Sequence, residues 1–403
     1  MKTVGIIAEF NPFHNGHRYL IDQAKKATNA DYAVVVMSGN FTQTGNVAIY
    51  DKFTRAKLAS EYGADIVLEL PSIYSNSSAE YFAFGAVSLL NSLNTVDYIC
   101  FGTETEKIEV FEHIVDVLTK NNYVITENIK SRLKMGLSYP VAREESLKNF
   151  LSEEEITTLK TPNNILGIEY LKALKKLNSE ITPICIKRES SDFNEKSINK
   201  SSNKYTSATS IRNMIKLNKI DLVENYVPAS TYTTILNGNP LYNDSLYKLL
   251  KYKVLTSDSD YLKTISEVTQ GLENKIKGEI THSNSYDELI FNLKSKRYTL
   301  TKIKRMLTNI LLDITKDDLK NIVNNNICYA HVLSLGIKGK DVLSAISKNT
   351  DIPIISKIND KILDSLDIDV LKYIKLDILA SNIYYTLSND IINKDYTNRL
   401  WFV

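Results

Sequence analysis

The sequence predicts an α/β fold, with a doubly wound parallel sheet in the N-terminal domain and an α-helical C-terminal domain. Short apolar runs rich in β-branched residues alternate with amphipathic stretches over the first half of the chain. Continuous apolar strands separated by helices are typical of parallel strands that are covered on both faces. Beyond about residue 217 this alternation stops, and the pattern is that of helices joined by polar connections. We therefore predict two domains, 1–216 and 217–403.

The strands and helices of the first half follow one another in a regular order. Pro71 ends the third strand, and the polar stretch 189–206 has so little to bury that we expect it to be mobile. Right-handed crossovers between parallel strands place ligands at the carboxyl ends of those strands. We expect strands at 3–9, 32–37, 65–70, 96–101 and 181–186, helices at 17–28, 51–62, 79–93 and 107–120, and a mostly helical stretch at 129–178.

The composition excludes several classes of protein. The formal net charge of +2 over 403 residues is too small to indicate a nucleic-acid partner, so any basic surface must be local. Cys100, Cys185 and Cys328 lie far apart, which argues against a disulfide framework and a zinc site, and we predict no metal site. The sequence opens directly into a strand, and no apolar run approaches the roughly 20 residues of a membrane span. We expect a cytoplasmic protein.

A loop with two histidines follows the first predicted strand. Asn11-Pro12-Phe13-His14-Asn15-Gly16-His17 leads into a helix that we expect to begin near His17. The loop therefore lies at the carboxyl edge of the sheet and at a helix N-terminus, where free N–H groups favour phosphate. His14 and His17 can both point at one phosphate and stabilise charge that builds in a transition state. The alternative is that one histidine caps the helix and the other packs against it.

A second candidate phosphate site lies at the start of a later helix. Thr206-Ser207-Ala208-Thr209-Ser210-Ile211-Arg212 combines hydroxyl groups with an arginine one turn further on. Such a helix start suits the β- and γ-phosphates of ATP. Taken alone, the segment is better explained as a helix cap followed by a surface arginine, and it gains a functional meaning only together with the histidine loop.

The strand followed by His-x-Gly-His resembles the signature of the nucleotidyltransferase superfamily, and Thr206 to Arg212 resembles its second motif. Further stretches are similar to the bacterial tRNA(Met) cytidine acetate ligase family over essentially the whole chain. They are 8–17, Met37-Ser38-Gly39-Asn40-Phe41, Leu68-Glu69-Leu70-Pro71, Phe101-Gly102-Thr103-Glu104, Pro162-Asn163-Asn164-Ile165-Leu166-Gly167, Ile186-Lys187-Arg188 and 207–212.

This resemblance implies a Rossmann-like ATP-binding domain and an activity. Members of the family activate acetate with ATP to acetyl-adenylate, release pyrophosphate, and transfer acetyl to N4 of the wobble cytidine in elongator tRNA(Met). The implied cofactors are ATP, expected with Mg²⁺, and acetate, without acetyl-CoA. His14 and His17 are the implied catalytic residues. The implied ATP-binding residues are Ile7, Ala8, Glu9, Phe10, Asn11, Pro12, Phe13, His14, Asn15, Gly16, His17, Arg18, Tyr19, Leu20, Gly102, Asn163, Asn164, Arg188, Ser207 and Arg212.

The roles of several residues in this set can be interpreted in more than one way. Gly102 ends a predicted strand and leaves room for adenine or ribose, but it is equally a turn glycine. One of Asn163 and Asn164 caps a helix and the other contacts the nucleotide, and the resemblance favours Asn163 for the nucleotide. Arg188 follows the last strand and meets a phosphate, or it is a surface arginine.

The loop after the second strand and a basic run complete the predicted site. Gly39, Asn40 and Gln43 are candidates for the acetate or cytidine pocket, although Thr44 stands where the family often has arginine. The run 294–305 is the densest basic segment, and a basic turn at 336–340 is a weaker candidate for RNA contact. Solvated helix faces often carry such charges. The predicted tRNA-binding residues are Arg297, Tyr298, Lys304 and Arg305.

Two other functions share some of these features. A small-molecule adenylyltransferase would have the histidine motif, but it gives no reason for so long a helical C-terminal half. An RNA-binding protein with a vestigial nucleotide site would carry the basic run without needing the histidines. The motifs of the loop support ATP use by themselves, whereas acetate and tRNA depend on the resemblance.

Overall fold

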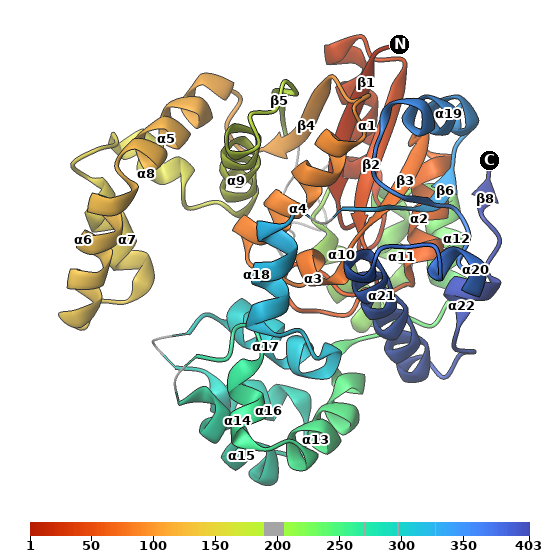
Figure 1. Ribbon diagram of the computed structural model, residues 1–403. Helices are drawn as coiled ribbons and strands as arrows, with labels where there is room; N and C mark the ends of the chain where they lie inside the picture. Colours follow the sequence, from red (N-terminus) through yellow and green to blue (C-terminus); the bar gives the residue numbers. More distant parts are fainter. Residues whose placement is uncertain (189–204, 270, 296–297, 327) are drawn as a thin grey trace.

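The computed structural model describes residues 1–188, 205–269, 271–295, 298–326 and 328–403. In this part of the chain one mainly parallel sheet forms the centre (Figure 1). No helix among the described residues has both the length and the apolar character needed to cross a membrane. The strands are β1 (Thr3–Ala8), β2 (Tyr32–Ser38), β3 (Ile66–Leu70), β4 (Tyr98–Thr103), β5 (Thr182–Lys187), β6 (Ala330–Leu335), β7 (Ile354–Ile355) and β8 (Trp401–Phe402).

The strand order is β5-β4-β1-β2-β3-β6-β7, and β8 pairs with β6. Strands β5 to β3 of this order are parallel to one another, so their carboxyl ends meet at one edge. The order reverses between β1 and β4, which is where ligands bind in open α/β sheets. The predicted doubly wound parallel sheet is confirmed, and all five predicted strands are present.

Helices cover both faces of the sheet because its strands are apolar on both sides. Val35 belongs to a core with Ile21 of α1, whereas the neighbouring Val34 belongs to the core that contains Val87 of α4. The helices of the first half are α1 (Asn15–Thr28), α2 (Lys52–Glu61), α3 (Ser72–Ser75), α4 (Ala79–Ser92), α5 (Ile108–Lys120), α6 (Asn122–Lys134), α7 (Tyr139–Leu147), α8 (Glu153–Thr158) and α9 (Pro162–Lys176).

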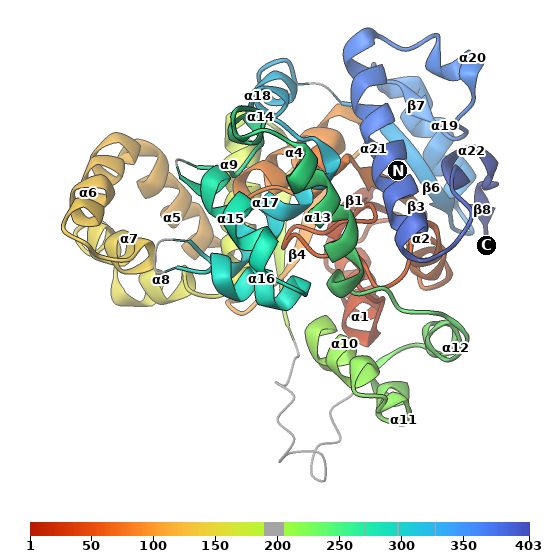
Figure 2. The same cartoon turned by 90° about the horizontal axis from the view of Figure 1, so that it is seen from below.

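Further helices lie around the sheet. Helices α5 to α8 form an arm on one side, and α13 to α17 form a group below the sheet (Figure 1). Figure 2 shows that α10 to α12 lie beside this group and not within it. These helices are α10 (Ala208–Lys216), α11 (Ile220–Val223), α12 (Ala229–Asn237), α13 (Tyr247–Thr256), α14 (Ser259–Thr264), α15 (Leu272–His282), α16 (Tyr286–Leu293), α17 (Leu300–Leu312), α18 (Lys316–Asn324), α19 (Gly339–Asn349), α20 (Asp360–Leu363), α21 (Ile368–Leu387) and α22 (Lys394–Thr397), with short 3-10 turns at Glu224–Tyr226 and Asn243–Leu246.

The C-terminal half differs from the prediction in one respect. It is mostly helical, as expected, but β6, β7 and β8 return to the sheet, and β6 pairs antiparallel with β3. We expected 220–403 to be wholly helical and separate from the sheet. That expectation is wrong for β6, β7 and β8, which belong to the sheet. They are short, and no repeated alternation with helices marks them in the sequence. A boundary at 216/217 remains a prediction, and the stretch 189–206 lies outside the described residues except for its last two.

Candidate active site

A cavity of about 320 Å³ opens at the carboxyl ends of β1 and β4, where the strand order reverses. A narrower pocket of about 40 Å³ adjoins it and shares His14, His17, Gly102 and Arg188 with it. The larger cavity is lined by Ile7, Ala8, Glu9, Phe10, Asn11, His14, His17, Leu20, Gln43, Thr44, Phe82, Phe101, Gly102, Pro162, Asn163, Leu166, Tyr170, Arg188, Ser207, Ala208, Thr209 and Arg212.

The histidine loop is fixed from both sides before it enters α1. The Asn11 carbonyl accepts a hydrogen bond of 2.6 Å from the Arg212 guanidinium, and its side-chain oxygen accepts one of 2.9 Å from the Ile49 amide. Phe10 adopts a left-handed conformation with φ of 47°, and its ring lies edge-on against Phe13 at 5.0 Å between centroids. Both rings are buried. The loop is therefore set by contacts from distant segments.

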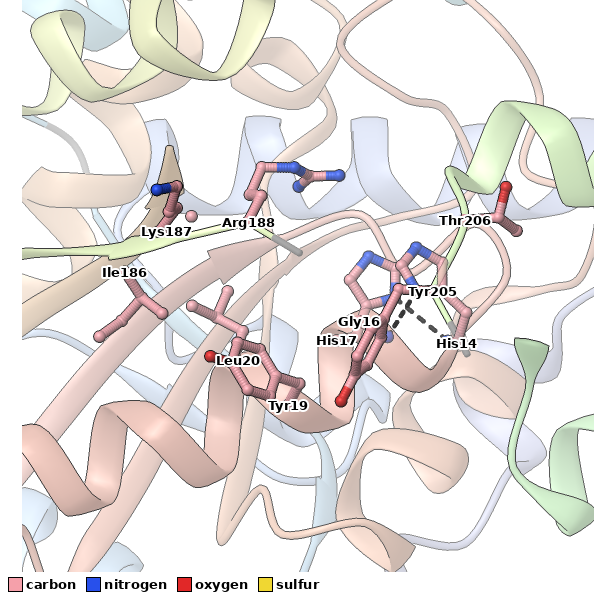
Figure 3. Close-up of a pocket in the computed structure, with 11 residues that line it drawn as sticks. His14, Gly16, His17, Tyr19, Leu20, Ile186, Lys187, Arg188, Tyr205 and Thr206 are labelled. Carbon is pink, nitrogen blue, oxygen red and sulfur yellow. Dashed lines mark hydrogen bonds between the residues drawn. The ribbon is translucent and has the colours of Figure 1, made fainter. Parts of the chain in front are cut away.

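The two imidazoles are held in one tautomer by backbone amides. Nδ1 of His14 accepts from the Gly16 amide at 3.0 Å, and Nδ1 of His17 accepts from the His14 amide at 3.2 Å. Each Nδ1 is an acceptor, so in the neutral ring Nε2 carries the hydrogen. The rings stack with centroids 3.6 Å apart. Figure 3 shows them side by side at the pocket, near Arg188.

His14 is the N-cap of α1, so the helix begins at Asn15, two residues before the predicted start near His17. The alternative in which one histidine caps the helix is thus correct for His14, yet the same ring lines the cavity. Capping uses Nδ1 and leaves Nε2 for a ligand. The two interpretations do not exclude each other.

Both histidines are neutral at ordinary pH. Burial, followed by the charges of Arg188 and Arg212, lowers the pKa of His14 to about 3. Burial, His14 and Arg188 lower the pKa of His17 well below its usual range. Two neutral Nε2–H donors can hydrogen-bond phosphate oxygens without becoming charged themselves. They are preorganised for developing negative charge.

Arg188 and Gly102 act together at the ends of β5 and β4. The Arg188 amide bonds the Thr103 carbonyl at 2.9 Å, and a Cβ on Gly102 would lie 3.2 Å from Cγ of Arg188. The glycine therefore makes room for the arginine stem as well as for a ligand. Within the described residues the guanidinium has neither a hydrogen bond nor an ion pair, and burial lowers its pKa. It is a cation available to an anionic ligand.

Asn163 and Asn164 lie in the first turn of α9, and neither caps it, because the N-cap is Thr161. That part of the prediction is wrong. The buried Asn164 accepts from the Glu104 amide at 3.0 Å and donates to the Thr105 hydroxyl at 3.2 Å, so it fastens α9 to the loop after β4. Asn163 lines the cavity and donates to the Glu104 carboxylate at 2.6 Å. The geometry favours Asn163 over Asn164 for ligand contact.

Ser207 and Arg212 belong to the first turns of α10. Ser207 is the N-cap and accepts from the Ser210 amide at 3.1 Å. Arg212 is no simple surface arginine, since it bonds the Asn11 carbonyl and, at 2.9 Å, the Thr209 hydroxyl. Ile211 and Met214 pack α10 against Ile49. The second motif thus lies across the cavity from β4 and supports the histidine loop.

The loop after β2 contributes to the cavity in part. Gln43 and Thr44 line it, whereas Asn40 is buried and accepts from the Lys52 amide at 2.7 Å. A Cβ on Gly39 would lie 2.4 Å from the Glu69 carboxylate, so this glycine serves packing. The prediction of a pocket role is therefore supported for Gln43 and not for Gly39 or Asn40.

Several functional positions were not predicted. Phe82, Phe101, Leu166 and Tyr170 line the cavity, but apolar residues in a sequence look the same whether they face a core or a ligand. Arg55 is fully buried and donates to the backbone carbonyls of Glu9, Ser38, Gly39 and Tyr50. A lone arginine in an amphipathic helix gives no sign of such a role.

The basic run near α17 is only partly accessible. Arg297 lies outside the described residues. Arg305 is buried and forms an ion pair with Glu267 at 2.8 Å. The prediction that Arg305 contacts an RNA phosphate is therefore wrong. Lys304 is partly buried and donates to Asn46 at 3.1 Å, and Tyr298 lies under the Lys302 ammonium at 5.3 Å. The turn 336–340 contacts Asp65 before β3, at the opposite edge from the cavity.

One buried cluster has the spacing of a metal site. Ligand atoms of Glu69, His331 and Asp395 lie within 4.8 Å of one another. However, the Lys52 ammonium lies 2.7 Å from Glu69 and 2.5 Å from Asp395. A cation already neutralises these carboxylates, so among the described residues this is an ion-pair cluster.

Comparisons with known proteins agree with this geometry. The family model described as HIGH Nucleotidyl Transferase matches residues 1–399. The tRNA(Met) cytidine acetate ligase of Clostridium perfringens (strain SM101 / Type A) is 40% identical over 98% of both chains. The enzyme of that name from Caldanaerobacter subterraneus subsp. tengcongensis is 40% identical over 95% of both. The crystal structure of Thermotoga maritima TmcAL bound with alpha-thio ATP superposes with a TM-score of 0.91 at 29% identity, covering 100% of both chains.

Proposed function

Because the chain belongs to the tRNA(Met) cytidine acetate ligases within the HIGH nucleotidyltransferase family, we propose that it forms acetyl-adenylate from ATP and acetate. It then transfers the acetyl group to N4 of the wobble cytidine of elongator tRNA(Met), and releases AMP and pyrophosphate. The single observation that supports the adenylation step best is the pair of neutral Nε2–H donors at the carboxyl edge of the sheet, and the choice of acetate and tRNA is supported by the similarity to the named ligases.

In the first step an acetate oxygen attacks the α-phosphate, and the bond to pyrophosphate breaks. His14 and His17 donate hydrogen bonds to the oxygens on which negative charge grows. Arg188 offers its guanidinium to a phosphate, and the first turn of α10 with Ser207 offers amides and hydroxyls to the β- and γ-phosphates. Asn163 and the space beside Gly102 are placed for the nucleoside.

Mg²⁺ is proposed to arrive with the triphosphate. Among the described residues that line the larger cavity, Glu9 is the one carboxylate, and one of its oxygens already accepts the Gln43 amide. Magnesium is usually held by one or two carboxylates, by phosphate oxygens and by water, so the lining is compatible with such an ion. When bound, it would neutralise phosphate charge. No acetyl-CoA is required, since the adenylate itself is the activated acetyl donor.

The second step needs the anticodon near the cavity. Helix α17 lies directly behind the loop that carries Gln43 and Thr44, because the Thr308 hydroxyl donates to the Gly45 carbonyl at 3.1 Å. Lys304 and Tyr298 are therefore proposed to contact the tRNA backbone and a base beside the cavity, whereas Arg297, outside the described residues, stays a prediction from the sequence. Arg305 is left out of this set because it is buried.

The deciding experiment incubates the full chain with labelled acetate, ATP and purified elongator tRNA(Met). We expect label on the RNA as N4-acetylcytidine, and acetate-dependent exchange of pyrophosphate into ATP. A His17→Ala variant that still binds ATP should lose both. Pyrophosphate exchange without acetate would instead support a small-molecule adenylyltransferase. Unchanged activity of His17→Ala would support an RNA-binding protein with a vestigial site. Either result overturns the proposal.

A further inference from the structure

The guanidinium of Arg55 on α2 joins four backbone carbonyls. Its Nε donates to the Tyr50 carbonyl at 2.9 Å, and one terminal nitrogen donates to the carbonyls of Glu9 and Ser38 at 2.6 and 3.1 Å. The other terminal nitrogen donates to the Gly39 carbonyl. The side chain is fully buried, and among the described residues it forms no ion pair.

These carbonyls come from the segments that lead into the cavity lining. The ladder between β1 and β2 ends at the residues just before Glu9 and Ser38. Arg55 joins Glu9 to Ser38 at this point, where one chain continues into the histidine loop and the other into the loop that carries Gln43. Both loops line the cavity, whereas Arg55 itself does not. Any effect of this residue on the reaction must therefore pass through other groups.

A short path of contacts leads from Glu9 to His17. Phe10 follows Glu9 in a left-handed conformation, and its buried ring lies edge-on against the imidazole of His17, with 4.8 Å between the ring centroids. On the other side of Phe10, the Asn11 carbonyl accepts a hydrogen bond of 2.6 Å from Arg212. The carbonyls before and after Phe10 are thus each fixed by an arginine. The ring that supports His17 depends on both.

One arginine that bonds four carbonyls does more than fill space. Burial lowers the pKa of Arg55, because desolvation disfavours its charged form. A buried charge without an ion pair is costly unless its hydrogen bonds are satisfied. The guanidinium has five N–H donors in one rigid plane, whereas a lysine ammonium has three donors at one point. The planar group therefore fixes the positions of the four carbonyls relative to one another.

We propose that Arg55 is a positioning residue for the adenylation step, which keeps Nε2 of His17 directed at the α-phosphate. It acts through the Glu9 carbonyl and the ring of Phe10. This inference rests on the proposed function. Arg55 touches neither ATP nor acetate, so its contribution arises when charge grows on the phosphate oxygens and His17 must already be in place. A misplacement of about 1 Å can cost about 100-fold in rate.

Arg55→Lys tests the proposal, because lysine keeps the charge but has too few donors for all four carbonyls. The single-turnover rate of adenylate formation at saturating ATP and acetate should fall about 100-fold. The Kd for ATP should stay close to the wild-type value, since an interaction made only in the transition state changes the rate and not the binding. Free guanidinium, well below denaturing concentrations, should restore part of the rate of Arg55→Ala. Arg399→Lys, at an exposed arginine, should change neither quantity.

The histidine signals distinguish positioning from stabilisation alone. In ¹⁵N NMR spectra the His17 imidazole of Arg55→Lys should have a changed chemical shift. The control is Ile346→Ala, which removes buried atoms from α19, the helix after the turn at the opposite edge of the sheet. It should lower the melting temperature but leave the His17 signal and the rate per folded molecule unchanged. Circular dichroism gives the folded fraction of each variant.

A wild-type rate or an unchanged His17 signal in Arg55→Lys overturns the inference. A loss of ATP affinity as large as the loss of rate overturns it as well. If neither Arg55 variant folds, Phe10→Leu interrupts the same path, and wild-type values in that variant are equally contrary. If the wild type forms no adenylate with acetate, the proposed function fails, and the NMR spectra still decide whether Arg55 positions His17.

Discussion

The ammonium of Lys52 lies 2.7 Å from the carboxylate of Glu69, and neither side chain reaches solvent. Asp395 lies 2.5 Å from the same ammonium, and His331 lies 2.7 Å from Glu69. Burial alone would lower the pKa of Lys52, but Asp395 and Glu69 raise it. Burial would raise the pKa of Glu69, yet Lys52 and His331 lower it to about 2. The cluster joins α2, β3, β6 and α22.

Removing the cation should destabilise the fold strongly. We expect Lys52→Met to lower the free energy of unfolding by about 3–5 kcal/mol, because two buried carboxylates would lose their counter-ion. Urea unfolding followed by circular dichroism measures the change. Lys120→Met removes a lysine from an exposed pair with Asp116 and should have little effect. Equal effects of the two substitutions would show that the buried cluster is not a major source of stability.

His14 and His17, the two histidines that line the cavity, should remain neutral with the hydrogen on Nε2. ¹⁵N NMR of the imidazoles should give two of the five histidines as this tautomer, without titration near the usual pKa of about 6.5. Burial lowers the pKa of both imidazoles, so both rings stay neutral down to acidic pH. Spectra of His14→Asn and His17→Asn assign the signals. Protonation of either ring near neutral pH would contradict this prediction.

Arg188 should contribute to ATP binding through one charged hydrogen bond. Such a bond contributes about 1.5–3 kcal/mol, so Arg188→Ala should raise the Kd for ATP roughly 10- to 100-fold. Isothermal titration calorimetry measures the Kd for ATP of each variant. Arg399→Ala, an exposed arginine near the C-terminus, serves as the control for charge alone. Unaltered ATP affinity in Arg188→Ala would remove this residue from the nucleotide site.

Gly45 should tolerate no side chain. Its φ is +76°, and a Cβ would lie 2.3 Å from the backbone nitrogen of Arg305 in α17. Gly45→Ala should therefore lower the melting temperature and disturb the loop that carries Gln43. Gly136 has a φ of +88° but nothing within 4 Å, so Gly136→Ala should cost only about 1–2 kcal/mol of backbone strain. Similar melting temperatures of the two variants would argue against close packing of α17 on the loop.

Lys304 should act on tRNA without acting on ATP. Its partly buried stem places the ammonium beside Asn46, next to the loop of the cavity. Lys304→Ala should weaken tRNA binding and lower the slope of log affinity against log salt by about 1, as expected for one phosphate contact. Filter binding at several salt concentrations measures the slope. Lys348→Ala, exposed on α19, is the control, and an unchanged slope in Lys304→Ala would exclude the contact.

The N-terminal sheet and the position of the histidine loop at its carboxyl edge could be predicted from the amino-acid sequence. Short, continuous β-branched runs separated by helices are typical of parallel strands covered on both faces, and the carboxyl ends of parallel strands must share one edge. The placement of His14, His17, Gly102 and Arg188 around one cavity follows from that rule. The conformation of the histidine loop, by contrast, depends on the distant contacts of Asn11 with Arg212 and Ile49.

Features that depend on segments far apart in the chain became apparent only in the folded structure. Strand β6 joins the sheet because β3 has a free edge with which it can pair. The short apolar run that forms β6 does not show by itself which strand it will pair with. Lys52 with Glu69 and Arg305 with Glu267 become buried ion pairs only when their elements pack together. The sequence alone could not distinguish these side chains from solvated charges, because burial is a property of the packed molecule.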